Sequence, residues 1–256
     1  MRHGSKTTIL AAVLGLVLGA AACTGGSGSS SASQTDRADT VPARNAAAQA
    51  VQPQAHSAIE DSMRAAGLVD LSQISPAIML DLRYATRHNF ARRNMYGDYC
   101  KAYATRATAR SLAQALRSLQ REDPDLGIVI FDAARPLSAQ RAMWRCVKGT
   151  TGERYVARPF KGGPHNYGVA LDLSLTRRGV PIDMGTDFDT FGPLAHIDAE
   201  DALVARGQLS AEAVANRRLL RRAMTGAGFM TYRREWWHFE RHRVAWARAH
   251  ERLLDF

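Results

Sequence analysis

A run of alternating residues in the second half of the chain strongly limits how this sequence can fold. From 169 to 175 every second residue is apolar, which is the period of a half-buried β-strand. Asp172 falls on the opposite face, where an ionised carboxylate is costly unless a cation or hydrogen-bond donors meet it. His165 precedes the strand, and the turn-forming residues 166–168 allow its imidazole to return beside Asp172. The stretch therefore predicts a strand that carries part of a metal site.

A second stretch, Glu235-Trp-Trp-His238, lies near the end of the chain. A catalytic zinc ion takes about three protein ligands and keeps one position for water, beside a carboxylate that accepts the proton of that water. We expect one Zn²⁺ with His165, Asp172 and His238 as ligands and Glu235 as the base. Residues three apart on a regular strand face opposite sides, so Glu235 and His238 need a bulge or a turn to converge.

Two further histidines compete as metal ligands. His242 follows His238 by four residues, but the apolar, aromatic sequence around His238 does not indicate an amphipathic helix that would bring both to one face. His196 stands alone in the sequence, and an isolated histidine is usually structural. We therefore rank His242 second and His196 third.

These motifs together resemble those of a known family. The pattern His, six residues, Asp at 165–172 is followed by Glu-Trp-Trp-His at 235–238, and further matching motifs lie at 80–86 with 89–90, at 131–136 and at 183–189. In this order they are similar to the D-alanyl-D-alanine dipeptidases of the vancomycin-resistance type, zinc peptidases that act on a cell-wall dipeptide. The resemblance covers nearly everything after about residue 70.

The resemblance implies roles for the residues of the site. It implies that His165, Asp172 and His238 bind zinc, that Glu235 is the catalytic base and that Arg135 stabilises the transition state.

Arg135 and Tyr84 have two interpretations each on the residues alone. Arg135 lies at a predicted strand-to-helix junction, where its guanidinium can pair with Asp132 or meet a developing oxyanion. The family resemblance favours the catalytic role. Tyr84 is a substrate contact by the same resemblance, whereas the residues alone equally allow a tyrosine packed at a strand end.

A dipeptidase must recognise a free ammonium group one residue from the bond that it cleaves. By the resemblance, Asp189 meets this ammonium and Tyr84 lines the same end of the pocket, while Asp187 is the second choice. One departure from the family concerns Gly163, because the resistance dipeptidases carry serine there. A substrate contact from that hydroxyl is absent in this chain.

The formal net charge of +10 raises the question of an anionic partner. Lysine and arginine are scattered along the sequence, and no helix-turn-helix, zinc-finger or RNA-binding signature occurs, so we expect no nucleic-acid partner. A basic exterior suits anionic cell-wall polymers or lipid headgroups, but a simply solvated surface is our preferred interpretation.

The first 57 residues divide into two parts. Residues 1–23 have a positive start, an apolar run and small residues before Cys23, as in a bacterial lipoprotein signal with Cys23 as the lipidation site. Plain secretion is the alternative. Residues 24–57 are rich in Ser, Gly, Ala and Gln and predict a disordered tether. We therefore expect an extracytoplasmic protein on the periplasmic or cell-surface side, held at the membrane by a lipid anchor.

Two cysteines, Cys100 and Cys146, belong to the mature domain. An even number of cysteines in an oxidising compartment favours a disulfide between them over a nucleophilic role.

Residues 58–256 predict a single α+β domain with a small, mainly antiparallel sheet flanked by helices and the zinc site on the sheet. The sequence contains no internal repeat and no second domain boundary. The patterns predict helices over 107–121, 138–147 and 210–224, and strands over 77–84, 126–131, 169–175, 180–184 and 229–239.

Three functions fit these observations. The first is zinc-dependent hydrolysis of the dipeptide D-alanyl-D-alanine in cell-wall peptide turnover or recycling. The second is a zinc D,D-carboxypeptidase or muropeptide endopeptidase with the same metal site. The third is a non-catalytic, cell-wall-binding lipoprotein in which the metal only braces the fold; Glu235 argues against it, since a structural metal site has no use for a free carboxylate.

Overall fold

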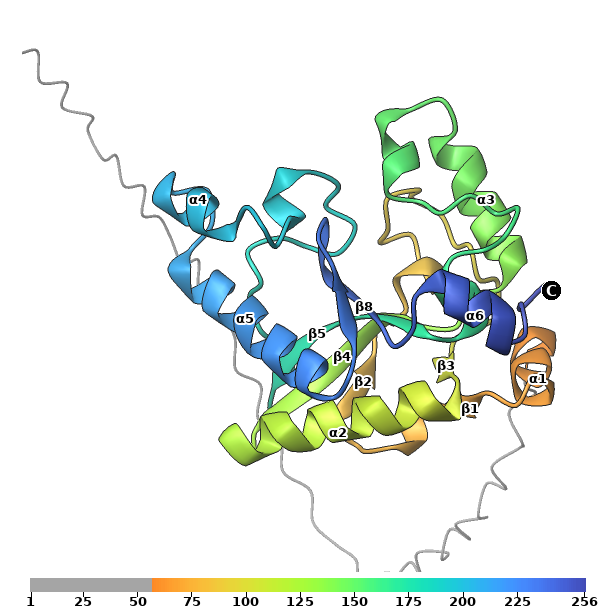
Figure 1. The fold of residues 1–256 in the computed structure, drawn as a ribbon, viewed down its shortest axis with the longest axis horizontal. Helices are drawn as coiled ribbons and strands as arrows, with labels where there is room; N and C mark the ends of the chain where they lie inside the picture. The colour runs from red at the N-terminus through yellow and green to blue at the C-terminus, as the bar shows by residue number, and fades with distance from the viewer. Residues whose placement is uncertain (1–56) are drawn as a thin grey trace, which may run out of the picture. The chain divides into compact units, whose positions relative to one another are not determined.

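The computed structural model describes residues 57–256 (Figure 1). The main sheet consists of β2 (Ile78–Leu80), β4 (Leu126–Asp132), β5 (Ala170–Arg177), β6 (Val180–Pro181), β7 (Met230–Tyr232) and β8 (Glu235–Glu240). Its strand order is β2-β4-β5-β8-β7, and β6 pairs with the end of β5. Only β2 and β4 run parallel, which confirms the predicted, mainly antiparallel sheet. A separate two-stranded sheet joins β1 (Val69–Asp70) to β3 (Tyr103–Ala104).

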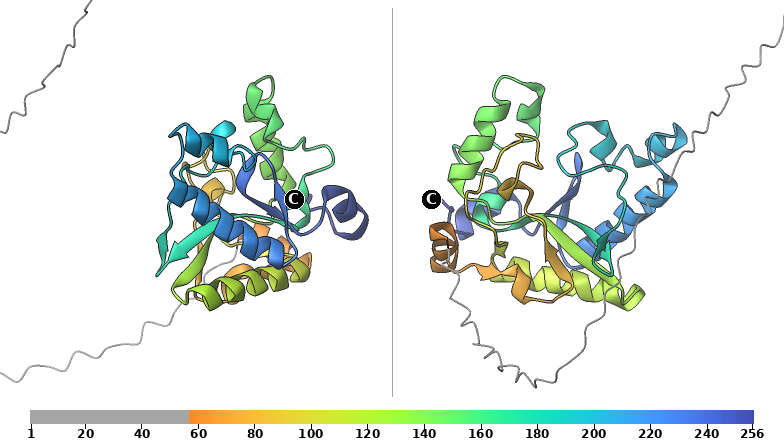
Figure 2. Two further views of the ribbon diagram at one scale, coloured as in Figure 1. Left: turned by 60° about the vertical axis from the view of Figure 1, so that its left-hand side comes forward. Right: turned by 180° about the vertical axis from the view of Figure 1, so that it is seen from behind.

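Helices flank the sheet, as the sequence predicts for an α+β domain. The α-helices are α1 (Ala58–Ala65), α2 (Arg106–Glu122), α3 (Leu137–Val147), α4 (Glu200–Ala205), α5 (Ala211–Gly226) and α6 (Val244–His250). Short 3₁₀ helices lie at Leu71–Gln73, Arg83–Ala85, Thr151–Arg154, Pro164–Tyr167 and Pro193–Ala195. Helices α2 and α5 pack against each other and against the sheet, on the side away from α3 (Figures 1 and 2).

The strand that the alternating sequence predicts is β5, in the middle of the sheet between β4 and β8. One of its faces contributes to the main hydrophobic core through Leu171, Leu173 and Leu175. The other face is buried as well, since Asp172 and Ser174 are each 3% exposed. The prediction of a half-buried strand is thus wrong, because polar side chains from neighbouring segments cover the face that carries Asp172.

The start of α3 differs from its prediction. The sequence predicts this helix from residue 138, but it begins at Leu137, and Pro136 stands at the cap position without a side-chain hydrogen bond. The backbone N–H groups of Leu137 and Ser138 instead donate to the carbonyls of Leu254 and Phe256, at 2.8 and 3.2 Å. The end of the chain therefore caps this helix, and no local sequence signal announces such a contact.

The predicted strand over 229–239 is in fact a hairpin, with β7 and β8 joined at Arg233 and Arg234. The turn contains no Gly, Asn or Pro, which is why the sequence gives no signal for it. The predicted strand over 77–84 is shorter than expected, because the chain enters a 3₁₀ helix after β2. The predicted arm over 180–184 reduces to β6.

The predicted lipoprotein signal (1–23), Cys23 and most of the tether lie outside the described residues. Ser57, which was assigned to the tether, belongs to the domain, since its hydroxyl oxygen accepts a hydrogen bond from the Glu60 N–H at 3.2 Å and caps α1. Within residues 57–256, no helix has the length and apolar character that crossing a membrane requires.

Candidate metal centre and substrate pocket

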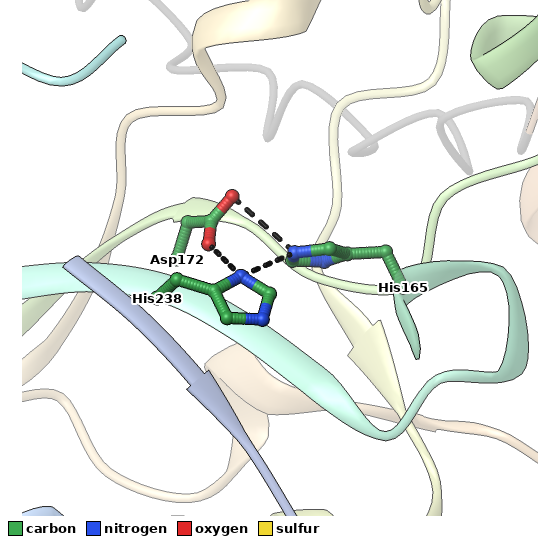
Figure 3. Close-up of side chains that lie close together, drawn as sticks. All are labelled: His165, Asp172 and His238. Carbon is green, nitrogen blue, oxygen red and sulfur yellow. Dashed lines mark hydrogen bonds and ion pairs between the residues drawn. The ribbon is translucent and has the colours of Figure 1, made fainter. Parts of the chain in front are cut away.

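Three side chains from separate segments converge on one point above the sheet (Figure 3). Asp172 and His238 are cross-strand partners on β5 and β8, with His238 Nδ1 2.9 Å from Asp172 Oδ1. His165 belongs to the 3₁₀ helix before β5, and Gly168, at a φ of 66°, turns the chain back into the strand. His165 Nε2 lies 3.3 Å from Asp172 Oδ2 and 3.2 Å from His238 Nδ1. The structure thus contains the chain reversal that the sequence predicts.

The donor set fits a zinc ion. Within residues 57–256 these three side chains are the group that could hold a metal, with ligand atoms all within 4.8 Å of one another. The His165 Nδ1–H donates to the Ala133 carbonyl at 2.8 Å, which leaves the Nε2 lone pair facing the other two side chains. Two imidazole nitrogens and a carboxylate oxygen are ligands that zinc prefers, and they leave a fourth position open.

The charges of the cluster support the same conclusion. Burial opposes ionisation of Asp172, but His165 and His238 hold the pKa of this carboxyl well below its usual value. Burial likewise opposes a charge on His165, yet Asp172 raises the pKa of its imidazole. Asp172 thus stays ionised although it is buried, and such a carboxylate favours a cation beside it, either a protonated His165 or a metal ion that replaces that proton.

A bulge brings Glu235 to the same pocket as His238. Thr231 pairs with Phe239, while its neighbour Tyr232 pairs with Glu235, so β8 has extra residues over this stretch. Glu235 and His238 both line the pocket as a result, as the sequence analysis required. Burial and then the carboxylates of Asp172 and Asp189 raise the pKa of Glu235 well above its usual value.

Arg135 pairs with Asp132, which is one of the two interpretations that the sequence left open. Its Nε donates to Asp132 Oδ2 at 2.8 Å, and its Nη2 makes a second contact with the same oxygen. The guanidinium also lines the pocket, with Nη2 3.9 Å from Asp172 Oδ2, and stacks over the Tyr84 ring with Cζ 5.1 Å from the centroid. Burial opposes its charge, but Asp132 holds the pKa of Arg135 above its ordinary value.

Two residues that support Arg135 were not identified as site residues from the sequence. Asp132 is fully buried and also accepts hydrogen bonds from the Tyr96 hydroxyl and the Ala133 N–H. Gln140 on α3 accepts from Arg135 Nη1 at 2.7 Å and donates to the Ala157 carbonyl at 2.7 Å. Only the position of Asp132 beside Arg135 gave a signal, as a candidate ion-pair partner; Gln140 gave none.

Asp189 and Tyr84 lie together at another part of the pocket wall. The Tyr84 hydroxyl donates to Asp189 Oδ1 at 3.0 Å, and the Phe90 N–H donates to Asp189 Oδ2 at 3.2 Å. Burial is the main cause that raises the pKa of Asp189 to about 7. The backbone at Asp189 is left-handed with a φ of 59°, an uncommon conformation for a non-glycine residue that tends to occur at functional sites.

The rival residues lie elsewhere. Asp187 forms a partly exposed ion-pair group with Arg83 and His88, at 3.1 and 2.9 Å. His196 lies beside the Tyr155 hydroxyl, at 3.4 Å. His242 stacks on Trp246, with ring centroids 3.6 Å apart, and so neither rival histidine joins the metal cluster of the described residues.

The predicted disulfide between Cys100 and Cys146 is not present. Both cysteines are free and exposed. The Cys100 thiol lies 3.7 Å from Glu60 Oε1 of α1, whereas the Cys146 thiol donates a hydrogen bond to the Ala142 carbonyl within α3. The prediction rested on an even count and on the compartment, and neither says where the two side chains lie in the fold.

The pocket has a volume of about 520 Å³. Its walls come from β8, from α3, from the segment 153–158 and from the start of α6. Gly163 lies in this wall, and a Cβ atom at this position would lie only 2.9 Å from Ala157 Cβ. The glycine therefore lets the segment that contains Ala157 approach more closely than a serine would allow.

Comparison with known proteins places the chain in a family. A family model described as D-ala-D-ala dipeptidase matches residues 64–254. Relatives named D-alanyl-D-alanine dipeptidase include one from Escherichia coli K12, 33% identical over 175 residues, which cover 68% of this chain and 83% of the relative. One from Enterococcus faecalis is 28% identical over 192 residues, 68% of this chain and 91% of the relative. One from Streptomyces coelicolor is 30% identical over 187 residues, 66% of this chain and 88% of the relative.

These matches show that the chain is a peptidase. Because the family model covers most of the chain, it belongs to the D-ala-D-ala dipeptidase family, as its motifs indicated. Peptidases of this family depend on zinc, and His165, Asp172 and His238 form a possible site for the ion.

The raised pKa of Asp189 predicts a cost in stability. In the unfolded chain this carboxyl ionises near its ordinary value of 3.8, but in the folded protein only near 7, so its ionisation destabilises the fold as the pH rises between these values. We expect Asp189→Asn to raise the melting temperature at pH 8 by at least about 2 to 4 °C, the change that roughly 1 kcal/mol produces in a domain of this size, since so large a rise in pKa costs the fold more than that. At pH 4 the wild type and Asp189→Asn should have the same melting temperature.

Asp187→Asn is the matched control from the same loop. Because Asp187 is paired with Arg83 and His88, its replacement should leave the melting temperature unchanged or lower it. If Asp189→Asn gives no gain at pH 8, the burial of an ionised Asp189 is not costly and this account of its pKa is wrong.

Proposed function

We propose that the chain is a zinc-dependent dipeptidase that hydrolyses D-alanyl-D-alanine, with one Zn²⁺ held by His165, Asp172 and His238. The observation that supports this most is the meeting of this ligand set, Glu235 and Arg135 in one pocket. The dipeptide specificity is suggested by the names of the relatives.

Glu235 acts as the base in this proposal. When bound, zinc supplies a Lewis acid and lowers the pKa of a water ligand towards about 7. Glu235 takes the proton from the attacking water and passes it to the nitrogen of the leaving amine. Burial raises the pKa of Glu235, which makes its carboxylate a stronger proton acceptor, as general-base catalysis requires.

Arg135 stabilises the oxyanion of the transition state. Its guanidinium is held in place by Asp132 and Gln140, so its orientation needs no rearrangement when negative charge develops. Arg135 is only 8% exposed, and burial strengthens such an electrostatic contact.

Asp189 binds the free ammonium of the substrate. The two hydrogen bonds from Tyr84 and Phe90 fix its carboxylate, and the arrival of a cation favours its ionised form. A charge-assisted contact of this kind contributes about 1.5 to 3 kcal/mol.

A second candidate function keeps the same chemistry but a longer substrate. The pocket volume of about 520 Å³ lies in the range that holds drug-sized ligands, and is larger than a dipeptide needs. Gly163 also replaces the family's serine in the pocket wall. These two observations favour a D,D-carboxypeptidase or muropeptide endopeptidase as the alternative.

A non-catalytic, wall-binding role fits less well. In such a protein the metal would brace the fold, and the pocket would have no need for a buried carboxyl such as Glu235 next to the metal cluster. Burying this group without a catalytic use only lowers stability.

The metal and the base can be separated by mutation. We expect His165→Ala to lose zinc and activity together, because it removes one of three ligands. Glu235→Gln should keep zinc and lose activity, because it removes only the proton acceptor. Zinc content by atomic emission and hydrolysis of D-alanyl-D-alanine are the two measurements.

His196→Ala serves as the control for the ligand change, since His196 lies outside the metal cluster, and it should keep both zinc and activity. Full zinc occupancy in the His165 variant, or an active Glu235 variant, would contradict the proposed mechanism.

Substrate length distinguishes the two peptidase functions. A dipeptidase that reads the ammonium with Asp189 should lose roughly one to two powers of ten in kcat/KM for D-alanyl-D-alanine on Asp189→Asn. With the wild type, acetylation of the dipeptide's amine should lower kcat/KM at least as much. With Asp189→Asn, acetylation should lower kcat/KM less, because the substitution has already removed the contact that acetylation removes.

The comparison includes a muropeptide stem that ends in the same two residues. Comparable turnover of the dipeptide, the acetylated dipeptide and the stem would reject the dipeptidase function and leave the carboxypeptidase.

We also propose that the protein acts outside the cytoplasm as a lipoprotein anchored at Cys23, in the turnover or recycling of cell-wall peptides. The sequence of residues 1–23 supports this location. Radiolabelled palmitate should be incorporated into the wild-type protein in its bacterial host and not into Cys23→Ser. Equal labelling of both proteins would exclude Cys23 as the anchor.

A further inference from the structure

The exposed side of α2 carries a row of arginines. Arg106, Arg110, Arg117 and Arg121 are separated by four, seven and four residues, spacings that return to the same side of an α-helix. All four are exposed. The charges that look scattered along the sequence are therefore aligned in the fold, which corrects the sequence analysis. We call this row the α2 arginine stripe.

Within the described part of the chain, no carboxylate pairs with the arginines of the stripe. The ion pairs of residues 57–256 involve none of its four arginines. The only acidic residue of α2 is Glu122, which pairs with Arg222 of α5 at 3.6 Å. Several other exposed arginines of the domain have carboxylate partners, for example Arg178 with Asp125 and Arg233 with Asp198. A concentration of unpaired positive charge attracts anions.

A groove runs beside the stripe. It has a volume of about 450 Å³, and Arg110, Arg117 and Arg241 all line it. Arg241 follows β8, and its Nε donates to Ser111 Oγ at 3.1 Å, which fixes the side chain and leaves its terminal nitrogens for a ligand. The other lining residues are small or neutral, and they include no carboxylate: Ala107, Ala113 and Gln114. Three guanidinium groups around one groove form a site for phosphate.

We propose that the α2 arginine stripe and its groove bind a linear cell-wall polymer with a phosphate in every repeat, of the poly(glycerol phosphate) type. The stripe extends about 22 Å along the helix axis, from Arg106 to Arg121, so several phosphates of one chain contact it together. This site is independent of the peptidase activity and of its substrate.

The shape of the site favours a thin polymer over a membrane. Arg241 is half-buried at the groove, where a flexible chain reaches it but a flat layer of headgroups does not. No large apolar side chain is exposed on α2 for insertion into lipid. The groove also has no aromatic residue on which a nucleic-acid base would stack.

The location of the stripe leaves the pocket accessible. In Figure 1, α2 lies on the lower side of the sheet, whereas α3, which contributes Gln140 to the pocket, rises on the upper side. A bound polymer would hold the enzyme at the wall while peptides reach the pocket from the other side.

Binding of fluorescently labelled poly(glycerol phosphate) of defined length tests the proposal, measured by fluorescence polarisation between 0.05 and 0.5 M salt. The protein is the full-length chain with Cys23→Ser, so that a lipid anchor does not contribute to binding. Arg110→Gln with Arg117→Gln removes two contacts but keeps good helix-forming residues. The slope of log affinity against log salt should become shallower by about 1.4, or about 0.7 per lost contact on a flexible chain. If the wild type and the variant bind the polymer equally at 1 M salt, this change in slope corresponds to a roughly 25-fold lower affinity of the variant at 0.1 M salt.

Arg145→Gln with Lys148→Gln is the matched control, because it removes the same charge from exposed residues at the C-terminal end of α3. It should bind the polymer like the wild type, and both double variants should keep the wild-type melting temperature. Equal losses in the two variants, or no loss in the α2 variant, would overturn the proposal. So would tighter binding to phosphatidylglycerol vesicles or to a single-stranded oligothymidylate with the same number of phosphates.

Discussion

The buried carboxylate of Asp172 is the constraint on which the rest of this structure depends. It lies in the central strand of the sheet and is almost fully shielded from water, so its ionised form requires compensation at close range. His238 meets it from the neighbouring strand and His165 from the turn before its own strand. The same three groups that stabilise one another are those that offer a metal ion a ready set of ligands.

Arg135 connects this centre to the wall of the pocket. Asp132 is the register partner of Asp172 on β4, across a bulge, and it holds the guanidinium of Arg135. Gln140 continues the connection from Arg135 to the Ala157 carbonyl in the segment that closes the pocket. The bulges in β4 and β8 both lie at the site, where they re-aim side chains that a regular strand would turn away. The pocket thus depends on two β-bulges in an otherwise regular sheet.

The sequence predicted those parts of the molecule that depend on local pattern. The strand around Asp172 and the helix now called α2 follow from periodicity, and the need for a bulge follows from the spacing of Glu235 and His238. The cluster of His165, Asp172 and His238 could be predicted because the family motifs and the chemistry of the residues agree, and the structure brings the three side chains together. The parts that were missed depend on contacts between distant segments, which spacing does not encode. They are the cap of α3 by the end of the chain and the support of Arg135 by Gln140. The same reason explains the wrong disulfide between Cys100 and Cys146.

The most direct test of the central claim is an anomalous diffraction experiment on crystals of the protein grown with zinc, recorded on both sides of the zinc absorption edge. The account predicts one strong anomalous peak between His165, Asp172 and His238, about 2.0 to 2.1 Å from the two imidazole nitrogens, with one open position facing Glu235. A peak at His196 or His242 instead, or an ion enclosed by four protein ligands, would contradict it.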